Sequence, residues 1–157
     1  MGRNGNKFHL DAQERSSNLK AINMKTVLVF GTFDGLHPGH DDFFDQVKEL
    51  GDNIVVCLTQ DKVVRELKGK DPIEPFEQRK EALKKQSQIS QIIPGDLDIG
   101  AFRAISIVQP DIIAIGYDQD ELEKAITVWL DKYNGDIPVI QLRPFKPDTY
   151  KSSLLRK

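Results

Sequence analysis

The sequence predicts an α/β fold, a Rossmann-like three-layer sandwich around a five-stranded parallel sheet. Short apolar runs rich in β-branched residues, such as TVLVF at 26–30 and NIVVCLT at 53–59, suit strands that are buried on both faces. Segments with apolar residues at helical spacing separate these runs. Strands that alternate with helices in this way form parallel sheets that are covered on both faces. The length of 157 residues allows one domain with a substantial core.

Each element has its own local signal. In the first helix, Phe43, Phe44, Val47 and Leu50 form an apolar stripe, and Gly51 ends the helix. The expected strands lie at 26–30, at 53–59, within 91–95, at 111–116 and at 137–142. The expected helices lie at 38–50, 61–67, 75–86, 99–108 and 120–133.

Residues 1–23 differ from the rest of the chain. They are polar, lack a sustained apolar period and contain clusters of Gly, Asn and Ser. Because this composition cannot bury a face, we expect a flexible N-terminal extension before a single domain at 24–157. The segment also lacks the apolar stretch of a secretory signal. No apolar run in the sequence approaches the roughly 20 residues that span a bilayer, so no membrane partner is expected.

Charge and cysteine content exclude several classes of protein. The chain has 22 basic and 24 acidic residues, a net charge of −2, without the basic surplus usual for general nucleic-acid binders. Cys57 is the only cysteine, so an internal disulfide and a Cys-rich zinc site are excluded. Its apolar surroundings predict a small buried thiol. These features fit the reducing cytoplasm.

The segment with the clearest chemical content is GTFDGLHPGH, directly after the first expected strand. In an open parallel sheet, ligands bind beyond the carboxyl ends of the strands. Gly31 and Gly35 allow tight turns and close approach of the backbone to a ligand. The helix that follows offers free N–H groups and the positive end of its dipole. His37 and His40 are three residues apart and therefore fall on one side of this helix.

Two imidazoles at a helix N-terminus suit a polyphosphate, because they can donate hydrogen bonds to phosphate oxygens as charge shifts in the transition state. The segment supplies no covalent nucleophile, which favours direct attack of a bound acceptor on the α-phosphate of a nucleotide. Two other interpretations stay open. The histidines could only cap and pack the helix, or they could belong to a zinc site, although no third Cys or His ligand is evident.

GTFDGLHPGH resembles the signature of the cytidylyltransferase-like nucleotidyltransferase superfamily, whose hallmark is a T/HxGH motif after the first strand. The resemblance runs from about Lys25 to the C-terminus. It implies that residues 24–157 form a nucleotidyltransferase domain. It also implies that His37 and His40 stabilise the α- and β-phosphates of a nucleoside triphosphate, and that Thr32 contacts phosphate.

Further segments match the same superfamily. FEQRK supplies the family's Gln-Arg pair in the third helix, and ELKGKDP supplies Lys68 or Lys70 as the basic residue that faces the triphosphate. GYDQD matches the Gly-x-Asp element that reads the base and ribose, although Asp118 or Asp120 could also cap a helix. Besides the three catalytic residues, the resemblance thus implies nucleotide contacts for Gly31, Phe33, Gly39, Lys68, Arg79, Gly116, Tyr117 and Asp118.

The C-terminal segment resembles the family's Ile-Ser-Ser-Thr-x-x-Arg helix start. The resemblance implies that Ser152, Ser153 and Arg156 bind the β- and γ-phosphates. Two positions depart from the pattern, because Tyr150 stands where Ile is usual and Lys151 where Ser is usual. A disordered basic end is the alternative.

Within the superfamily, these motifs are most similar to archaeal-type FAD synthases, which transfer AMP from ATP to FMN. Glycerol-3-phosphate cytidylyltransferases are also similar, but they tend to have a Gly-Asp-Asp-Trp-like loop where this chain has Gly-Tyr-Asp-Gln. We therefore expect an FMN adenylyltransferase. The alternatives are a cytidylyltransferase that acts on glycerol 3-phosphate or another phosphoalcohol, and a non-catalytic nucleotide-binding regulator.

The resemblance also implies the ligands and partners of the protein. These are ATP or CTP with Mg²⁺ or another divalent cation, a small phosphorylated acceptor and, by analogy with relatives, a second copy of the chain in a homodimer.

Overall fold

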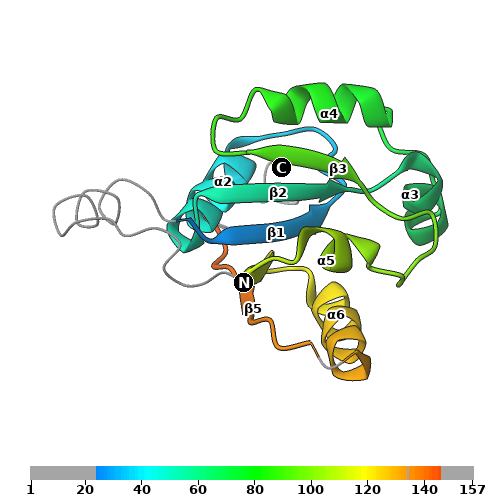
Figure 1. Cartoon of the computed structure of the whole chain (residues 1–157). Coiled ribbons are helices and arrows are strands. Elements are labelled where there is room, and N and C mark those ends of the chain that lie inside the picture. The colour runs from blue at the N-terminus through cyan, green and yellow to red at the C-terminus, as the bar shows by residue number, and fades with distance from the viewer. Residues whose placement is uncertain (1–23, 134, 146–157) are drawn as a thin grey trace, which may run out of the picture.

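The computed structural model describes residues 24–133 and 135–145, which build a five-stranded, fully parallel sheet (Figure 1). The strands pair in the order β3-β2-β1-β4-β5. The chain runs outward from β1 to β3 and then returns to the other side of β1 for β4 and β5, so the strand order reverses at β1. In open α/β sheets, ligands bind at such a reversal, beyond the carboxyl ends of the strands. The strands are β1 (Thr26–Gly31), β2 (Asn53–Leu58), β3 (Gln91–Pro94), β4 (Ile112–Ile115) and β5 (Val139–Gln141).

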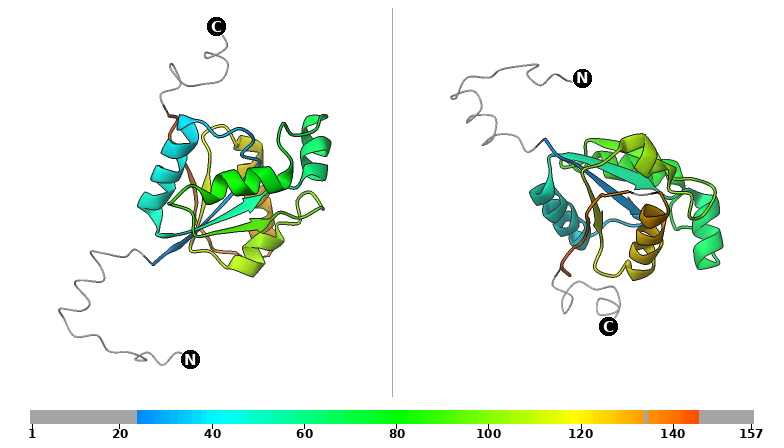
Figure 2. Two further views of the ribbon diagram at one scale, coloured as in Figure 1. Left: turned by 90° about the horizontal axis from the view of Figure 1, so that it is seen from above. Right: turned by 60° about the horizontal axis from the view of Figure 1, so that its bottom comes forward.

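Helices cover both faces of the sheet and complete three layers, which confirms the predicted fold class (Figures 1 and 2). Phe44 of α2 and Leu83 of α4 are buried in a core cluster on one face, while Ile105 of α5 and Ile126 of α6 are buried in a cluster on the other. The short helix α3 lies beyond the carboxyl ends of the strands, at the edge where ligands are expected (Figure 1). The helices are α2 (Pro38–Leu50), α3 (Asp61–Lys68), α4 (Phe76–Lys84), α5 (Arg103–Val108) and α6 (Asp120–Lys132).

The central strand β1 supplies both core clusters. Val27 and Val29 point to the face covered by α2 and α4, and Leu28 and Phe30 point to the face covered by α5 and α6. This alternation follows from the pleat of a strand, in which successive side chains point to opposite faces. Because all four side chains are buried, β1 reads as a continuous apolar run rather than as an alternating one.

Two helices and one strand differ by two or more residues at one end from the sequence-based expectation. Helix α5 begins at Arg103 rather than at residue 99, because Gly100 (φ +86°) and Phe102 (φ +46°) adopt left-handed backbone that a right-handed helix cannot include. Helix α4 ends at Lys84, two residues before the expected end. Strand β5 covers only the centre of the expected 137–142 run.

The described residues contain no helix that is long and apolar enough to cross a membrane. The expected extension at 1–23 and the expected phosphate-binding residues Ser152, Ser153 and Arg156 lie outside the described residues.

Candidate active site

A cavity of about 1110 Å³ lies at the carboxyl ends of the strands, where the strand order reverses. Residues from the β1–α2 segment, from α3, from the β3–α5 loop and from the β4–α6 loop line it. Of the predicted site residues that the structure describes, Arg79 and the alternative candidate Lys70 are absent from its wall. Those that line it are Gly31, Thr32, Phe33, His37, Gly39, His40, Lys68, Gly116, Tyr117 and Asp118.

The two histidines hold each other in place through the backbone at the start of α2. His37 is the N-cap residue, and its Nδ1 accepts a hydrogen bond from the backbone N–H of Gly39 at 3.0 Å. His40 Nδ1 accepts from the backbone N–H of His37 at 3.2 Å. The ring centroids are 4.2 Å apart. Since each Nδ1 acts as an acceptor, a neutral imidazole in either position carries its proton on Nε2 and can donate it to a ligand.

The environment keeps His40 neutral at physiological pH. Burial, with a smaller effect from the neighbouring His37, lowers the pKa of His40 from 6.5 to about 4, although Asp41 acts in the opposite direction. Burial lowers the pKa because it penalises the charged imidazolium. At pH 7, His40 is therefore a neutral hydrogen-bond donor rather than a fixed positive charge.

Small and strained residues shape the wall around the histidines. A Cβ atom at Gly39 would lie 2.7 Å from Cε1 of His37, so the glycine leaves room for the histidine ring to fold back over the helix start. Phe33 adopts φ +50°, an uncommon conformation for a residue with a bulky side chain. Its ring contacts the His40 ring edge-on, with 5.7 Å between centroids. Backbone strain of this kind is often concentrated at functional sites.

Asp34 ties the histidine segment to the loop between α3 and α4. Its carboxylate accepts hydrogen bonds from the backbone N–H groups of Ile73 at 2.6 Å and Glu74 at 2.9 Å. The link joins residues about 40 positions apart in the chain, and Asp34 also lines the cavity. The β1–α2 segment is therefore braced from outside as well as by its own hydrogen bonds.

Arg79 is buried and does not line the cavity. Its side chain is fully buried, and its guanidinium donates to the carbonyl oxygens of Thr32 at 2.9 Å and Thr59 at 2.8 Å. It also donates to the carbonyl of Glu74 and forms an ion pair with Asp61 at 2.6 Å. The structure thus uses Arg79 within the protein, where it joins the segments that follow β1 and β2.

The β4–α6 loop is held by a side chain that the sequence analysis did not identify. Gln119 accepts from the backbone N–H of Gly116 at 2.7 Å and donates to the carbonyl of Phe30 at 3.1 Å. It therefore fixes the Gly116–Asp118 loop against the end of β1. Gln119 is also the N-cap residue of α6, without a side-chain capping bond, so the capping role considered for Asp118 or Asp120 is wrong. Gln119 follows the predicted Gly-x-Asp element directly, which is the signal that could have identified it.

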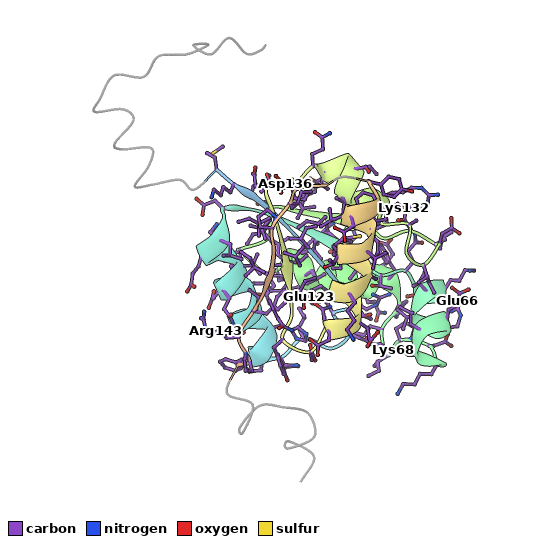
Figure 3. All side chains as sticks on the ribbon, turned by 90° about the horizontal axis from the view of Figure 1, so that it is seen from below. Glu66, Lys68, Glu123, Lys132, Asp136 and Arg143 are labelled. Atoms are coloured by element: carbon purple, nitrogen blue, oxygen red, sulfur yellow. The ribbon has the colours of Figure 1, made fainter. Side chains whose placement is uncertain are left out.

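Gln46 and Arg143 were also missed. The Gln46 amide accepts from the backbone N–H of Arg143 at 2.8 Å and donates to its carbonyl at 2.9 Å, which fastens α2 to the segment after β5. Both residues line the cavity. A polar residue inside the apolar stripe of α2, and a cation just beyond the last strand, were the available signals. In Figure 3, Arg143 and Lys68 lie on opposite sides of α6.

Neither a metal cluster nor a reactive thiol is present among the residues described. No group of three or more His, Cys, Asp or Glu side chains in this part of the chain could hold a metal ion, so the zinc interpretation gains no third ligand. Cys57 is buried as expected, and its burial, together with nearby Asp96, raises its pKa to about 12. A thiol with this pKa stays protonated at neutral pH and is a poor nucleophile.

Comparison with known proteins agrees with this geometry. A FAD synthase of Thermococcus sibiricus is 38% identical over 130 residues, which cover 83% of this chain and 85% of the relative. A FAD synthase of Pyrococcus abyssi is 35% identical and covers 83% of this chain and 89% of the relative. Among solved structures, a protein from Thermoplasma volcanium described as a lipopolysaccharide core biosynthesis protein superposes with a TM-score of 0.72. That match is 28% identical and covers 78% of this chain and 99% of the other.

The family model that matches the sequence spans residues 28–157, which include most of β1, the histidine segment and all later elements of the fold. The model is described as cytidylyltransferase-like. By the extent of this match and by the identity to its relatives, the chain belongs to the cytidylyltransferase-like family.

Proposed function

We propose that this chain transfers the adenylyl group of ATP to the phosphate of FMN, which yields FAD and pyrophosphate. The observation that carries the proposal is the histidine pair at the start of α2, in a chain 35–38% identical to relatives named FAD synthase. These relatives match along most of their length, so the similarity includes the whole cavity-bearing fold rather than one motif.

The reaction needs positioning and charge stabilisation more than proton transfer. A phosphate oxygen of FMN attacks the α-phosphorus of ATP in line with the bond to the leaving group. As the new P–O bond forms, the bond between the α-phosphorus and the oxygen bridging to the β-phosphate breaks, and pyrophosphate leaves with the electron pair. The Nε2–H groups of His37 and His40 donate hydrogen bonds to the phosphate oxygens where negative charge develops.

The remaining cavity residues bind and orient the two substrates. Thr32 lines the same cavity as the histidines, and Lys68 and Arg143 in its wall supply positive charge. The Gly116–Asp118 loop lies at the end of β4, where it reads the base. The carboxylates of Asp34 and Asp42 already accept hydrogen bonds within the protein, so a Mg²⁺ ion would be held mainly by phosphate oxygens and water. When bound, the ion neutralises phosphate charge.

A substrate panel tests the proposal directly. Pyrophosphate release is measured with ATP or CTP and with FMN or glycerol 3-phosphate, in the presence of Mg²⁺, and the products are separated by chromatography. We expect FAD from ATP and FMN only. Turnover with CTP and glycerol 3-phosphate would replace the proposal with the cytidylyl alternative. Tight binding of a triphosphate without turnover on any acceptor would identify a non-catalytic nucleotide-binding protein.

A further inference from the structure

One side of the cavity presents apolar side chains to solvent. Leu67, in the last turn of α3, is 62% exposed, and Ile99, in the β3–α5 loop, is 58% exposed. Both line the cavity, and neither belongs to the two core clusters. Single exposed apolar residues are common on protein surfaces. Here, however, two of them lie in the wall of one cavity, which the partly buried ring of Phe102 also lines.

The two walls that carry these side chains are fixed relative to each other. Gln60, the N-cap residue of α3, donates from its side chain to the carbonyl of Gly95 at 2.6 Å, which joins α3 to the start of the β3–α5 loop. Val63 and Val64 bury the other side of the helix. Figure 1 shows α3 and this loop together beyond the carboxyl ends of the strands.

The loop itself is closed by charged hydrogen bonds. Asp96 accepts from the backbone N–H of Arg103 at 2.8 Å and from its guanidinium at 3.2 Å. The Arg103 guanidinium also lies 3.5 Å from the carboxylate of Asp98. Ile99 follows Asp98 directly, so it is presented from a loop that is tied at both ends. A rigid apolar surface loses little conformational entropy when a ligand binds against it.

The order of the strands assigns this side of the cavity to the acceptor. Under the proposed function, the phosphates lie at the histidines, beyond β1, and the base lies at the Gly116–Asp118 loop, beyond β4. In the strand order, β2 and β3 lie on the opposite side of β1 from β4. Leu67 and Ile99 come from the segments that follow β2 and β3. A triphosphate placed in this way leaves their side of the cavity open for the second substrate.

We propose that Leu67 and Ile99 form a subsite for a flat, largely apolar ring system, and that this subsite selects a flavin phosphate over small phosphoalcohols. The inference rests on the proposed function, which gives the orientation of the nucleotide in the cavity. An acceptor such as glycerol 3-phosphate has no apolar surface to cover these side chains, whereas a fused ring removes them from water. Asp96 and Asp98 also line the cavity, and their carboxylates can accept hydrogen bonds from the hydroxyl groups of the linker between ring and phosphate in addition to those from Arg103.

Three single variants of the full chain test the subsite. Leu67→Gln and Ile99→Ser remove its apolar surface, and Ile107→Gln is the matched control, because Ile107 is 74% exposed on α5 and does not line the cavity. Flavin fluorescence quenching measures the Kd of FMN and of riboflavin, which has the ring without the phosphate. Calorimetry measures the Kd of ATP, and chromatography measures FAD formation.

We expect each cavity variant to raise the Kd of both flavins by about tenfold and to leave the Kd of ATP within about twofold. Ile107→Gln should bind both flavins like the wild type. If the wild type forms FAD while both cavity variants keep its flavin affinities, the subsite is overturned and the proposed function stands. If the wild type binds riboflavin and the cavity variants bind it more weakly, but no FAD forms, the proposed function fails and the subsite is supported. A wild type that binds neither flavin overturns both.

Discussion

Under the proposed function, His37 serves two purposes that a suitable substitution can separate. Its Nδ1 caps α2 by accepting from the Gly39 N–H, and its Nε2–H remains for the substrate. Asn is a favourable N-cap residue, so His37→Asn retains a capping oxygen but places no donor where the imidazole edge lies. We therefore expect the imidazole to be replaceable for the stability of the helix but not for the contact with phosphate.

We expect His37→Asn to lower kcat by roughly 10²- to 10⁴-fold while the free energy of unfolding stays within about 0.5 kcal/mol of the wild-type value. His37→Ala should show the same loss of kcat and cost about 1 kcal/mol more because the cap is lost. Steady-state kinetics of FAD formation and urea unfolding measure the two effects. Near-normal turnover of His37→Asn would reduce the histidine to a capping residue, which is the alternative that the sequence left open.

His40 makes the stability of the fold depend on pH. Its pKa is about 4 in the folded chain and close to 6.5 when unfolded, so the unfolded chain takes up a proton first as the pH falls. The free energy of unfolding therefore decreases from about pH 6.5 towards pH 4, by about 3 kcal/mol in total. His40→Gln removes this contribution and leaves all carboxyl groups in place.

The free energy of unfolding of the wild type should therefore fall by about 3 kcal/mol relative to that of His40→Gln when the pH is lowered from 7 to 4. Urea unfolding at several pH values measures this difference. Above pH 7 the difference in the free energy of unfolding between the two proteins should be constant, because His40 is largely neutral there in both the folded and the unfolded wild type. Curves that stay parallel over the whole range would show that His40 is not buried as the structure has it.

Among the elements, the ends of β1 and β2 are joined through α4. Arg79 donates to the carbonyls of Thr32 and Thr59, the residues that follow these strands, and its partner Asp61 opens α3. Lysine has the charge but not the planar fork of arginine, so it cannot reach the same acceptors together. Under the proposed function, Arg79 is a positioning residue, because it bonds Thr32 and Thr59, which line the cavity, and does not line the cavity itself.

We expect Arg79→Lys to lower the free energy of unfolding by about 2–4 kcal/mol and to lower kcat more than it changes the KM for ATP, because Thr32 loses its support. The matched control is Arg65→Lys, whose exposed ion pair with Asp71 should be worth less than about 1 kcal/mol. Urea unfolding and steady-state kinetics measure both. A large rise in the KM for ATP with an unchanged kcat would instead indicate direct contact between Arg79 and the nucleotide.

The elements that the sequence predicted well are those with local signals. Strand β1 is a continuous apolar run, and α2 begins at Pro38 and ends before Gly51, as expected. The start of α5 was wrong because a left-handed Phe102 leaves no mark in the hydrophobic pattern. The partners of Arg79 were not predictable either. Every residue has a carbonyl oxygen, and only the tertiary fold decides which of these oxygens the guanidinium reaches.

At the scale of the molecule, the strand order explains why one cavity collects residues from several segments that are far apart in the sequence. Since all strands are parallel, their carboxyl ends meet at one edge, and the reversal at β1 leaves room between the segments that follow β1 and β4. The sequence identified the histidine motif and the Gly116–Asp118 loop, but it did not single out the exposed side chains of Leu67 and Ile99. Their arrangement around one substrate pair depends on the sheet.

Two truncations of the whole chain separate stability from function. Both faces of β1 are buried by described elements, and both of its edges are paired, with β2 and β4. A chain that starts at Met24 should therefore keep its melting temperature within about 2 °C and its rate of FAD formation within about twofold. A chain that ends at Phe145 should also fold, because β5 and the Gln46–Arg143 contacts remain.

The second truncation removes Ser152, Ser153 and Arg156, which we expect to bind the β- and γ-phosphates. Its kcat/KM for ATP should fall by at least about 10²-fold, because charged hydrogen bonds to phosphate contribute about 1.5–3 kcal/mol each. Melting curves and FAD formation, measured on both truncated chains, distinguish the two ends. A loss of several degrees on removal of 1–23 would show that this segment packs on the core. Unchanged kinetics without 146–157 would place all phosphate binding on the histidine pair and the cations Lys68 and Arg143.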